Sequence, residues 1–544
     1  MATEPLIAGA AAPGHVLKRA LLGVGAAVVV VIVAAVIAAL TMSGASLASD
    51  STALAKLSVQ PLGGKIEHVE AFGANGKRVP ISVSGGRLTP LHKLHPGEQV
   101  AVSVRVRRPG WLGWALGHEQ TEHLTLRAPV AYLKERWMTV ASGSPVQASF
   151  ETPVSSVRYE SGGHTHDEAL ETPARTVSLG HRPATGTLQI AAAARSWETV
   201  GKPAHISWFP PSHSTVLAAS PAPGATIAPA AAIYLTFSKP VDEVLGAKRP
   251  QLSPATAGHW HKANSHTLEF RPSGFGMPLG SQLHLTLPRP VAVTASGGNG
   301  LKTTNQIAWT VPPGSTVRLH QLLAQAGYLP VSWRASSAEV AKTASAEAAA
   351  AVAPPAGDFD WRYPNTPHQL KEKWSPDQQT VLTKGAIMKF ENENDLTVDG
   401  VPGASVWRKL FADAIAGKHL NEGYSYVYVH REVPETATLW HAGHTIISSP
   451  ANTGISGAET ELGSFPVFEH VPETTMSGEN PDGSHYEDPG IKWVSYFNGG
   501  DALHNFNRSS FGSPQSLGCV ELPLAASAEI YKYTPIGTVV TVET

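Results

Sequence analysis

The sequence has a single cysteine, Cys519, among its 544 residues. An internal disulfide is therefore impossible, and so is a zinc site built from several cysteines. The chain also lacks an excess of charge of either sign, because its formal net charge is −2. This balance excludes the polycationic surface that nucleic-acid binding requires. We expect no nucleic-acid partner, and a stability that rests on packing alone.

Aromatic residues make up only 7% of the chain, whereas glycine (50) and proline (43) are plentiful. This composition favours many short strands and turns over long helices. A chain of 544 residues is too long for one hydrophobic core, and about 150 residues per domain predicts three or four domains. The predicted fold class is mainly β and multidomain.

One long stretch near the N-terminus lacks charge altogether. It runs from Ala20 to Met42 and would form a helix of about 35 Å, enough to span a bilayer core. Lys18 and Arg19 precede it, and no basic residue follows between 41 and 54. This asymmetry predicts a cytoplasmic tail at 1–19, a single-pass transmembrane anchor at 20–42, and the C-terminal bulk outside the cell membrane, in the cell wall.

A cleaved signal peptide is the alternative for this N-terminal stretch. The sequence Ser46-Leu47-Ala48 would suit a signal peptidase. The uncharged run is longer than the usual apolar region of a signal peptide, so we prefer the uncleaved anchor.

The sequence pattern of residues 56–312 predicts β-strands throughout. Segments such as 100–106 and 232–237 are apolar or alternating over strand lengths, and Gly/Pro/Asn/Ser turns separate them. Within this region, the stretch 220–226 followed by 235–242 resembles bacterial Ig-like domains, which serve as spacers and as binding modules alike. We expect three antiparallel sandwich modules, at 56–128, 129–210 and 211–312.

Two groups of alternating histidines have a metal-like spacing. His164 and His166 precede an Asp-Glu pair, and His259 and His261 flank a tryptophan. Alternate residues share one face of a strand, but the sequence places no third ligand beside either group. We interpret these histidines as solvated strand or loop positions and predict no metal site.

The sequence pattern of residues 313–420 predicts helices. Segment 317–329 fits a short helix ended by Gly327, and Ile387 with Phe390, then Trp407 with Leu410, fit two more helices with apolar cores. The order of these segments is similar to that of PGBD-like peptidoglycan-binding domains. That resemblance implies a small helical domain at 313–420.

An alanine-rich segment, 336–356, interrupts this helical pattern. Alanine favours helix, but the low complexity and the Pro354-Pro355 pair indicate a flexible insert.

Cys519 follows Gly518 and lies fifteen positions after His504. A thiol is nucleophilic only as a thiolate, so an imidazole within hydrogen-bond reach is its usual activator. Gly518 would allow a substrate carbonyl to approach the backbone, where amides could donate to an oxyanion. A small buried hydrophobe is the alternative role for a free cysteine, and the spacing alone leaves both open.

Several short motifs surround the cysteine in a recognisable order. They are Thr453-Gly454, 459–465, 496–500, Leu503-His504, 516–519 and 536–540. Their order resembles that of the YkuD family, the L,D-transpeptidase catalytic domain of bacterial cell-wall synthesis. The resemblance covers 421–544 and implies a β-rich catalytic domain in which Cys519 is the nucleophile.

The resemblance also implies a reaction. Cys519 would attack the carbonyl of the meso-diaminopimelate residue in a peptidoglycan tetrapeptide stem and expel D-alanine. His504 would accept the thiol proton, the backbone carbonyl of Asn505 would orient the imidazole, and the Gly518 backbone would help hold the oxyanion. An amine of a neighbouring stem would resolve the thioester into a 3→3 cross-link. No metal or organic cofactor is required.

The substrate would lie among residues close to this motif and in the long stretch between Phe465 and His504. That stretch has no clear periodicity, which is typical of a lid or a binding loop, although it could equally be a surface excursion held by its own aromatic residues. The predicted substrate-binding residues are Tyr486, Trp493, Tyr496, Phe497, Gly499, Gly500, Ser516, Leu517 and Glu521.

Two residues depart from the family pattern. Leu517 occupies the histidine position of Ser/Thr-His-Gly-Cys, so thiol activation would depend more heavily on His504. Glu521 replaces the usual Arg or Asn two residues after the cysteine and cannot pair with a substrate carboxylate. We hypothesise that Glu521 favours an amidated stem or orients the incoming amine. An L,D-carboxypeptidase with the same nucleophile and a non-catalytic wall-binding scaffold remain the alternative functions.

Overall fold

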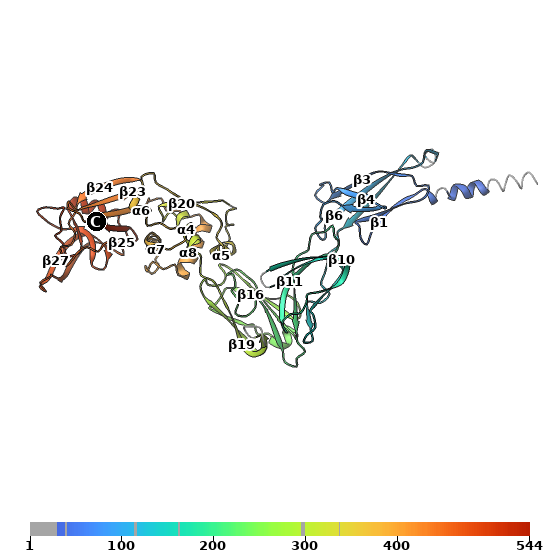
Figure 1. Cartoon of the computed structure of the whole chain (residues 1–544), viewed down its shortest axis with the longest axis horizontal. Helices are drawn as coiled ribbons and strands as arrows, with labels where there is room; N and C mark the ends of the chain where they lie inside the picture. The colour runs from blue at the N-terminus through green and yellow to red at the C-terminus, as the bar shows by residue number, and fades with distance from the viewer. Residues whose placement is uncertain are drawn as a thin grey trace, which may run out of the picture. The chain divides into compact units, whose positions relative to one another are not determined.

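The computed structural model describes residues 30–38, 41–111, 113, 117–161, 164–294, 300–336 and 338–544. The chain divides into two compact units, Met1–Ser212 and His213–Thr544. Strands dominate both units, and most of the described helices of the second unit lie between residues 316 and 416 (Figure 1). The predicted fold class, mainly β and multidomain, is confirmed.

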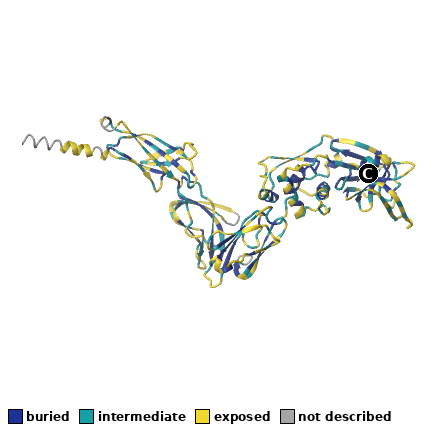
Figure 2. Cartoon of the chain, turned by 180° about the vertical axis from the view of Figure 1, so that it is seen from behind, coloured by how far each residue is buried: buried dark blue, intermediate teal, exposed yellow. Residues whose placement is uncertain are grey.

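The predicted cytoplasmic tail, 1–19, and residues 20–29 and 39–40 of the predicted anchor lie outside the described residues. Residues 30–38 are helical and exposed, as Figure 2 shows. None of the described helices has the length and hydrophobicity that a membrane-spanning helix requires. Ser46, Leu47 and Ala48, the alternative cleavage site, lie in strand β1 (Ala45–Ser49).

The first module consists of two sheets, ordered β1-β2-β5-β4 and β3-β6-β7. In β6, alternate valines from Val100 to Val106 are buried, as the alternating sequence predicts. The module begins at Ala45 and not at the predicted residue 56, because β1 pairs antiparallel with β2. Its other strands are β2 (Ala55–Val59), β3 (Lys65–Gly73), β4 (Ile81–Ser84), β5 (Arg87–Pro90), β6 (Gln99–Arg107) and β7 (Glu119–Arg127).

The second module is one five-stranded sheet, ordered β10-β9-β11-β12-β8. Its strands are β8 (Trp137–Thr139), β9 (Gln147–Ser161), β10 (His164–Ser178), β11 (Gly186–Ala193) and β12 (Ala204–Phe209). Trp197, between β11 and β12, belongs to the hydrophobic core of the first module. Its indole Nε1–H donates to the Thr52 carbonyl at 2.8 Å. The indole therefore joins the two modules of the first unit.

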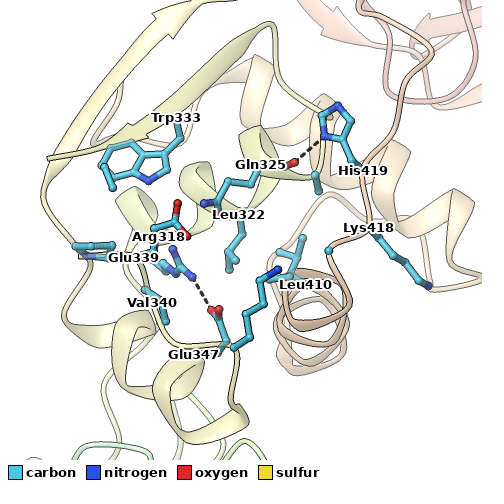
Figure 3. A pocket seen from close by; sticks show the side chains of 16 residues that line it. Arg318, Leu322, Gln325, Trp333, Glu339, Val340, Glu347, Leu410, Lys418 and His419 are labelled. Carbon is cyan, nitrogen blue, oxygen red and sulfur yellow. Dashed lines mark hydrogen bonds and ion pairs between the residues drawn. The ribbon is translucent and has the colours of Figure 1, made fainter. Parts of the chain in front are cut away.

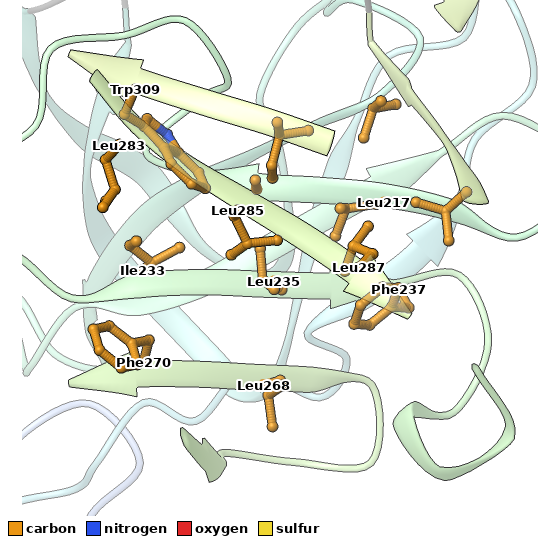
Figure 4. Close-up of a cluster of buried hydrophobic side chains, with 14 of the residues drawn as sticks. Leu217, Ile233, Leu235, Phe237, Leu268, Phe270, Leu283, Leu285, Leu287 and Trp309 are labelled. Carbon is orange, nitrogen blue, oxygen red and sulfur yellow. The ribbon is translucent and has the colours of Figure 1, made fainter. Parts of the chain in front are cut away.

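The third module is a seven-stranded sheet, ordered β15-β18-β13-β14-β17-β16, with β19 paired to β18. Figure 4 shows its core, in which Trp309 and leucines from facing strands meet. The predicted strand at 232–237 is confirmed as β14. The elements are β13 (Val216–Ser220), β14 (Ile233–Phe237), α3 (Val241–Leu245), β15 (Gln251–Ser253), β16 (Gly258–Lys262), β17 (Thr267–Pro272), β18 (Gln282–Thr294) and β19 (Leu301–Thr310).

The alternating histidines lie on these sheets as solvated residues. His164 and His166 are exposed on β10, and His259 and His261 are exposed on β16. Among the residues that the structure describes, no group of three His, Cys, Asp or Glu side chains could hold a metal ion.

The three predicted helices of the segment after 312 are confirmed. They are α4 (Thr316–Gln325), which ends before Gly327, α7 (Val381–Glu393) and α8 (Ala404–Ala416). Phe390 and Trp407 lie in one core with Leu319 and Leu410. Hairpin strands β20 (Val331–Ala335) and β21 (Gly357–Trp361), helix α5 (Ala344–Val352) and the short α6 (His368–Lys371) lie between α4 and α7.

The expectation that 336–356 forms a flexible insert was wrong for residues 344–352, which form helix α5. Thr343 caps α5, and its hydroxyl accepts from the Ala346 amide. One face of α5 is buried, and Glu347 on that face pairs with the buried guanidinium of Arg318 at 2.5 Å. Alanine has the highest helix propensity. The low-complexity sequence therefore forms a packed helix here and not a flexible insert.

The last domain contains two sheets, ordered β24-β23-β22-β30-β25 and β26-β27-β28-β29. Its apolar core includes Val427, Phe497 and Val540. The elements are β22 (Ser425–His430), β23 (Thr436–His441), β24 (His444–Pro450), β25 (Gly463–Pro466), β26 (Glu469–Glu479), β27 (His485–Asn498), β28 (Asp501–Asn505), β29 (Val520–Leu522), α9 (Leu524–Tyr531) and β30 (Val539–Glu543).

The stretch between Phe465 and His504 is not irregular, contrary to expectation. It is a long antiparallel hairpin of β26 and β27, with a turn at 480–484. In the outer part of this hairpin, exposed and half-buried residues alternate, but half-buried positions such as Thr474, Gly478 and Asp488 are not apolar. The sequence therefore has no apolar alternation to reveal these strands.

The helical segment and the last domain share a hydrophobic core. Tyr426 and Trp440 of the last domain pack in the same cluster as Phe390 of α7 and Leu410 of α8. The boundary predicted at 420 therefore separates two parts of the sequence and not two independent cores.

Candidate functional site

The strand register places His504 beside the cysteine. Strands β28 and β29 are parallel, and His504 lies directly opposite Glu521. Cys519 lies two residues before Glu521, and alternate residues of a strand point to the same face. His504, Cys519 and Glu521 accordingly line one cavity of about 370 Å³.

His504 is 3% exposed, and its Nδ1 lies 2.9 Å from the carbonyl oxygen of Asn505. A carbonyl can only accept, so Nδ1 carries the proton and Nε2 keeps its lone pair. Burial lowers the pKa of His504 below the usual histidine value, and the Asn505 carbonyl partly offsets this effect. The neutral imidazole is therefore ready to accept a proton at Nε2.

The thiol of Cys519 donates to the carbonyl of Gly500, with Sγ 3.5 Å from the oxygen. Burial raises its pKa to about 12, and the nearby carboxylates of Asp501 and Glu521 add to the rise, whereas the Ala502 amide opposes it. The resting sulfur is therefore a protonated thiol that is hydrogen bonded to the Gly500 carbonyl.

Gly518 has a conformation that L side chains rarely adopt, with φ of +113°. A Cβ at this position would lie 2.4 Å from Oδ1 of Asp501, so the backbone passes closely over that carboxyl. The Ser516 hydroxyl donates to the Cys519 carbonyl at 2.5 Å. These contacts fix the turn that presents the sulfur to the cavity.

The carboxylate of Glu521 is 5% exposed and has a cation partner that the sequence analysis missed. Arg508 donates from Nε at 2.8 Å and from Nη2 at 2.7 Å to the two carboxylate oxygens. Its Nη2 also donates to the carbonyl of Gln515, and its guanidinium lies 4.5 Å from the Phe506 ring centre. A charged residue at the +2 position after the cysteine needs a counter-ion, and that need was the only available signal for Arg508.

A second set of missed residues holds the loop between His504 and Cys519. The Asn452 side-chain oxygen accepts from the Gly512 amide at 3.0 Å, and the Asn452 backbone pairs with that of Glu521. Glu435, fully buried, accepts from the amide and the hydroxyl of Thr453, each at 2.6 Å. The Thr453-Gly454 motif noted in the sequence is thus a support for this loop.

The predicted substrate-binding residues separate into two groups. Tyr486, Ser516, Leu517 and Glu521 line the cavity with the cysteine and histidine. Gly500 contacts the thiol through its carbonyl, and Tyr496 packs in the small apolar cluster beside Cys519. Gly499 lies in the turn before β28 and does not line the cavity.

Two predicted substrate-binding residues point elsewhere. Phe497 is 2% exposed in the core between the sheets. Trp493 has a positive φ of 59° and packs on Tyr531 of α9, with ring centres 5.4 Å apart. Side chains of β27 alternate between faces, so these residues could not all face one cavity.

Another cavity, of about 280 Å³, lies in the helical segment (Figure 3). Its walls include Trp333, Leu322 and Leu410, and the buried Arg318–Glu347 ion pair forms part of the lining. His419 is held beside it, with Nδ1 donating to the Gln325 carbonyl at 2.7 Å.

The family match to known proteins lies in the last domain. Residues 424–542 match the family model YkuD, described as the L,D-transpeptidase catalytic domain. No curated protein matches the chain.

Solved structures with similarity to the chain have the following measures. An L,D-transpeptidase from Mycobacterium smegmatis is 13% identical and covers 61% of this chain and 99% of its own, with a TM-score of 0.21. L,D-transpeptidase 3 from Mycobacterium tuberculosis, in complex with a faropenem-derived adduct, is 11% identical over 60% of this chain and 97% of its own, with a TM-score of 0.21. The catalytic domain of the E. faecium L,D-transpeptidase is 23% identical over 23% of this chain and 98% of its own, with a TM-score of 0.20. The segment 424–542, which matches the model of the YkuD family of L,D-transpeptidase catalytic domains, is also the part of the chain that holds the cavity with Cys519 and His504.

Proposed function

We propose that this protein is a peptidoglycan L,D-transpeptidase that forms 3→3 cross-links through a Cys519 thioester. One observation carries the proposal: the free thiol and a neutral imidazole with an unprotonated Nε2 line the same cavity. Acyl transfer through a cysteine needs such a pair and no further cofactor.

The reaction would begin with rotation of the thiol from the Gly500 carbonyl toward His504. Because the resting pKa is about 12, the proton would move to Nε2 as the sulfur attacks the substrate carbonyl. The new C–S bond forms, and the Gly518 and Cys519 amides are the candidate donors to the oxyanion.

The imidazolium then gives its proton to the departing amine, and the C–N bond to D-alanine breaks. An amine of a second stem attacks the thioester, loses a proton to His504 and releases Cys519. These steps restore the enzyme, and His504 accepts and then donates the proton in each half of the reaction.

The presence of Glu521 favours a donor stem whose side-chain carboxyl group is amidated. Its charge is compensated by Arg508, so the pair is neutral as a whole and offers no free cation to a substrate carboxylate. Replacement of Glu521 with Arg, followed by turnover of amidated and free-acid stems, tests this preference. An unchanged preference would remove the idea.

The remainder of the chain would deliver the catalytic domain to the wall. We include in the proposal an anchor at 20–42, Ig-like spacer modules and wall binding by the PGBD-like helical segment, which the sequence patterns support. Membrane fractionation of cells that carry the intact chain, compared with a chain carrying two lysines within 20–42, tests the anchor. Equal partition of both into the membrane fraction would contradict it.

The decisive experiment is incubation of the chain with a disaccharide-tetrapeptide, followed by mass analysis of the products. A cross-linked dimer with loss of D-alanine supports the transpeptidase, and a tripeptide formed even with excess acceptor amine supports the carboxypeptidase instead. The C519S variant serves as the control and should give neither product.

A non-catalytic wall-binding scaffold is the second candidate function. It is favoured by the resting thiol, which is protonated and faces Gly500. Incubation with a carbapenem separates the two candidates. An absent Cys519 adduct, together with retention of the chain on isolated cell walls, would support the scaffold.

A further inference from the structure

The catalytic cavity contains one carboxylate that the reaction described above does not use. Asp488 lines the cavity together with Tyr486 and Met476 of the same hairpin. Met476 and Asp488 are direct partners across β26 and β27, and Tyr486 lies two residues before Asp488. The pairing and the alternation place these three side chains on the face of the hairpin that covers the cavity.

Asp488 lies within electrostatic range of both His504 and Arg508. It has no hydrogen-bond or ion-pair partner of its own among the described residues of the chain. A carboxylate that faces a substrate cavity without a partner is a site for a cationic group.

The other charges of the cavity do not compensate Asp488. Glu521 and Arg508 form a two-bonded pair, and burial keeps His504 and Cys519 neutral. The cavity therefore carries one net negative charge, on Asp488. A positive ligand group is attracted to it, whereas a ligand carboxylate is repelled.

We propose that Asp488 forms an ammonium subsite, which binds the side-chain amine of the donor residue whose carbonyl Cys519 attacks. The inference rests on the proposed function and deepens it. The donor side chain is tethered to the attacked carbonyl, so it must occupy space beside Cys519, and the cavity of about 370 Å³ that Cys519 and Asp488 share has room for it.

Arg508 completes the specificity of this subsite. Its Nη1 has no hydrogen-bond partner in the described chain, whereas Nε and Nη2 are engaged. A neutral amide oxygen on the donor side chain can accept from Nη1 without adding charge to the site. The substrate class is accordingly a stem whose diamino-acid side chain has a free ammonium and an amidated carboxyl group.

The test compares the full chain with its D488N and E487Q variants. Glu487 is exposed on the opposite face of the same strand and provides the matched control. Two amidated tetrapeptide donors are used, one with a free side-chain ammonium and one with that nitrogen acetylated. Acylation by faropenem, which has no ammonium, reports whether Cys519 and His504 remain functional.

We expect the unmodified chain and E487Q to favour the free-ammonium donor in kcat/KM by about tenfold or more, as charge-assisted hydrogen bonds generally do. D488N should lose this preference and keep its rate of faropenem acylation. A retained preference in D488N overturns the subsite.

A binding measurement tests the ammonium subsite independently of the proposed transpeptidase activity. Titration of both donors into C519S and into C519S with D488N measures the ammonium preference without any chemistry. Failure of the unmodified chain to react with either donor or with faropenem would refute the transpeptidase. Equal affinity of C519S for the two donors would refute the ammonium subsite, whether or not the chain is a transpeptidase.

Discussion

Arg508 holds the carboxylate of Glu521 through two hydrogen bonds of 2.8 and 2.7 Å. The carboxylate side of this pair is 5% exposed and the guanidinium side 31%. Removal of one partner from a buried pair leaves an uncompensated charge, which costs more than the pair itself contributes.

Replacement of Arg508 with Leu should therefore lower the free energy of unfolding by about 2–3 kcal/mol, less than for a fully buried pair because Arg508 is partly exposed. Denaturant unfolding at neutral pH measures the loss. The double variant with Leu at both 508 and 521 provides the control, since it leaves no unpaired charge and should recover most of the stability. A double variant as unstable as R508L would contradict this account.

The protonated state of Cys519 predicts a distinctive pH dependence of alkylation. With a thiol pKa raised to about 12, the iodoacetamide reaction should be slow at pH 7 and accelerate about tenfold per pH unit up to about pH 11. Mass analysis of the labelled chain gives the rate, and the absence of any other cysteine makes C519S a complete blank. A rate that levels off near pH 8 would show that the thiol is activated at rest.

The same shift affects stability at alkaline pH. The folded pKa of Cys519 is higher than the ordinary thiol value of 9.0, so the folded state holds this proton more tightly than the unfolded state. The stabilising contribution is fully present below about pH 9 and declines as pH rises toward 12. C519S should therefore lose less stability than the unmodified chain over this alkaline range.

His504 should remain neutral and active below the usual histidine pKa, because burial lowers its pKa from 6.5. The acid limb of the kcat/KM profile is therefore expected below pH 6.5, and H504Q should reduce turnover by about a hundredfold or more. The folded state takes up this proton less readily than the unfolded state, so the contribution of His504 to stability is lost as pH falls below 6.5. An acid limb above pH 6.5 would contradict the buried neutral imidazole.

Gly518 should tolerate no side chain. Alanine there would meet Asp501 Oδ1 at 2.4 Å and would have to adopt a φ of +113°. We expect G518A to reduce turnover at least tenfold and stability by about 1–3 kcal/mol. Gly403 is the matched control, since its Cβ would meet only the Val401 carbonyl, at 3.9 Å, and its φ is −71°. Equal effects of G518A and G403A would refute this explanation.

The ion pair of Arg318 and Glu347 is more deeply buried, at 2% and 4% exposure. R318L or E347L alone should destabilise the second unit by about 3–5 kcal/mol, whereas the double leucine variant should lie close to the unmodified chain. Thermal unfolding of the three variants measures these differences. A double variant that is the least stable of the three would show that the pair itself stabilises α5.

The sequence predicted strands and helices correctly where its apolar periodicity matched the pattern of buried residues in the folded chain. Val100 to Val106 alternate in β6, and Phe390 and Trp407 mark the buried faces of α7 and α8. It failed where burial leaves no such pattern. At the outer end of the β26–β27 hairpin, half-buried positions such as Thr474 and Asp488 are polar, and the buried face of α5 consists of alanines and a paired glutamate.

The candidate site shows the same division. His504 and Cys519 could be named from residue type and order, and the structure places them on one cavity. Arg508 and Asp488 could not, because their roles depend on contacts between β29, the loop after β28 and the hairpin. Trp493 and Phe497 were misassigned because the strand that carries them had not been recognised, and with it the alternation of its two faces.

The indole of Trp197, inserted into the neighbouring module and hydrogen bonded to Thr52, has a mechanical consequence. A tensile load along the first unit would have to extract the Trp197 ring from an apolar core before the two modules could separate. The first and second modules would therefore move as one rigid body and not as independently mobile domains. W197A would allow them to bend at their junction.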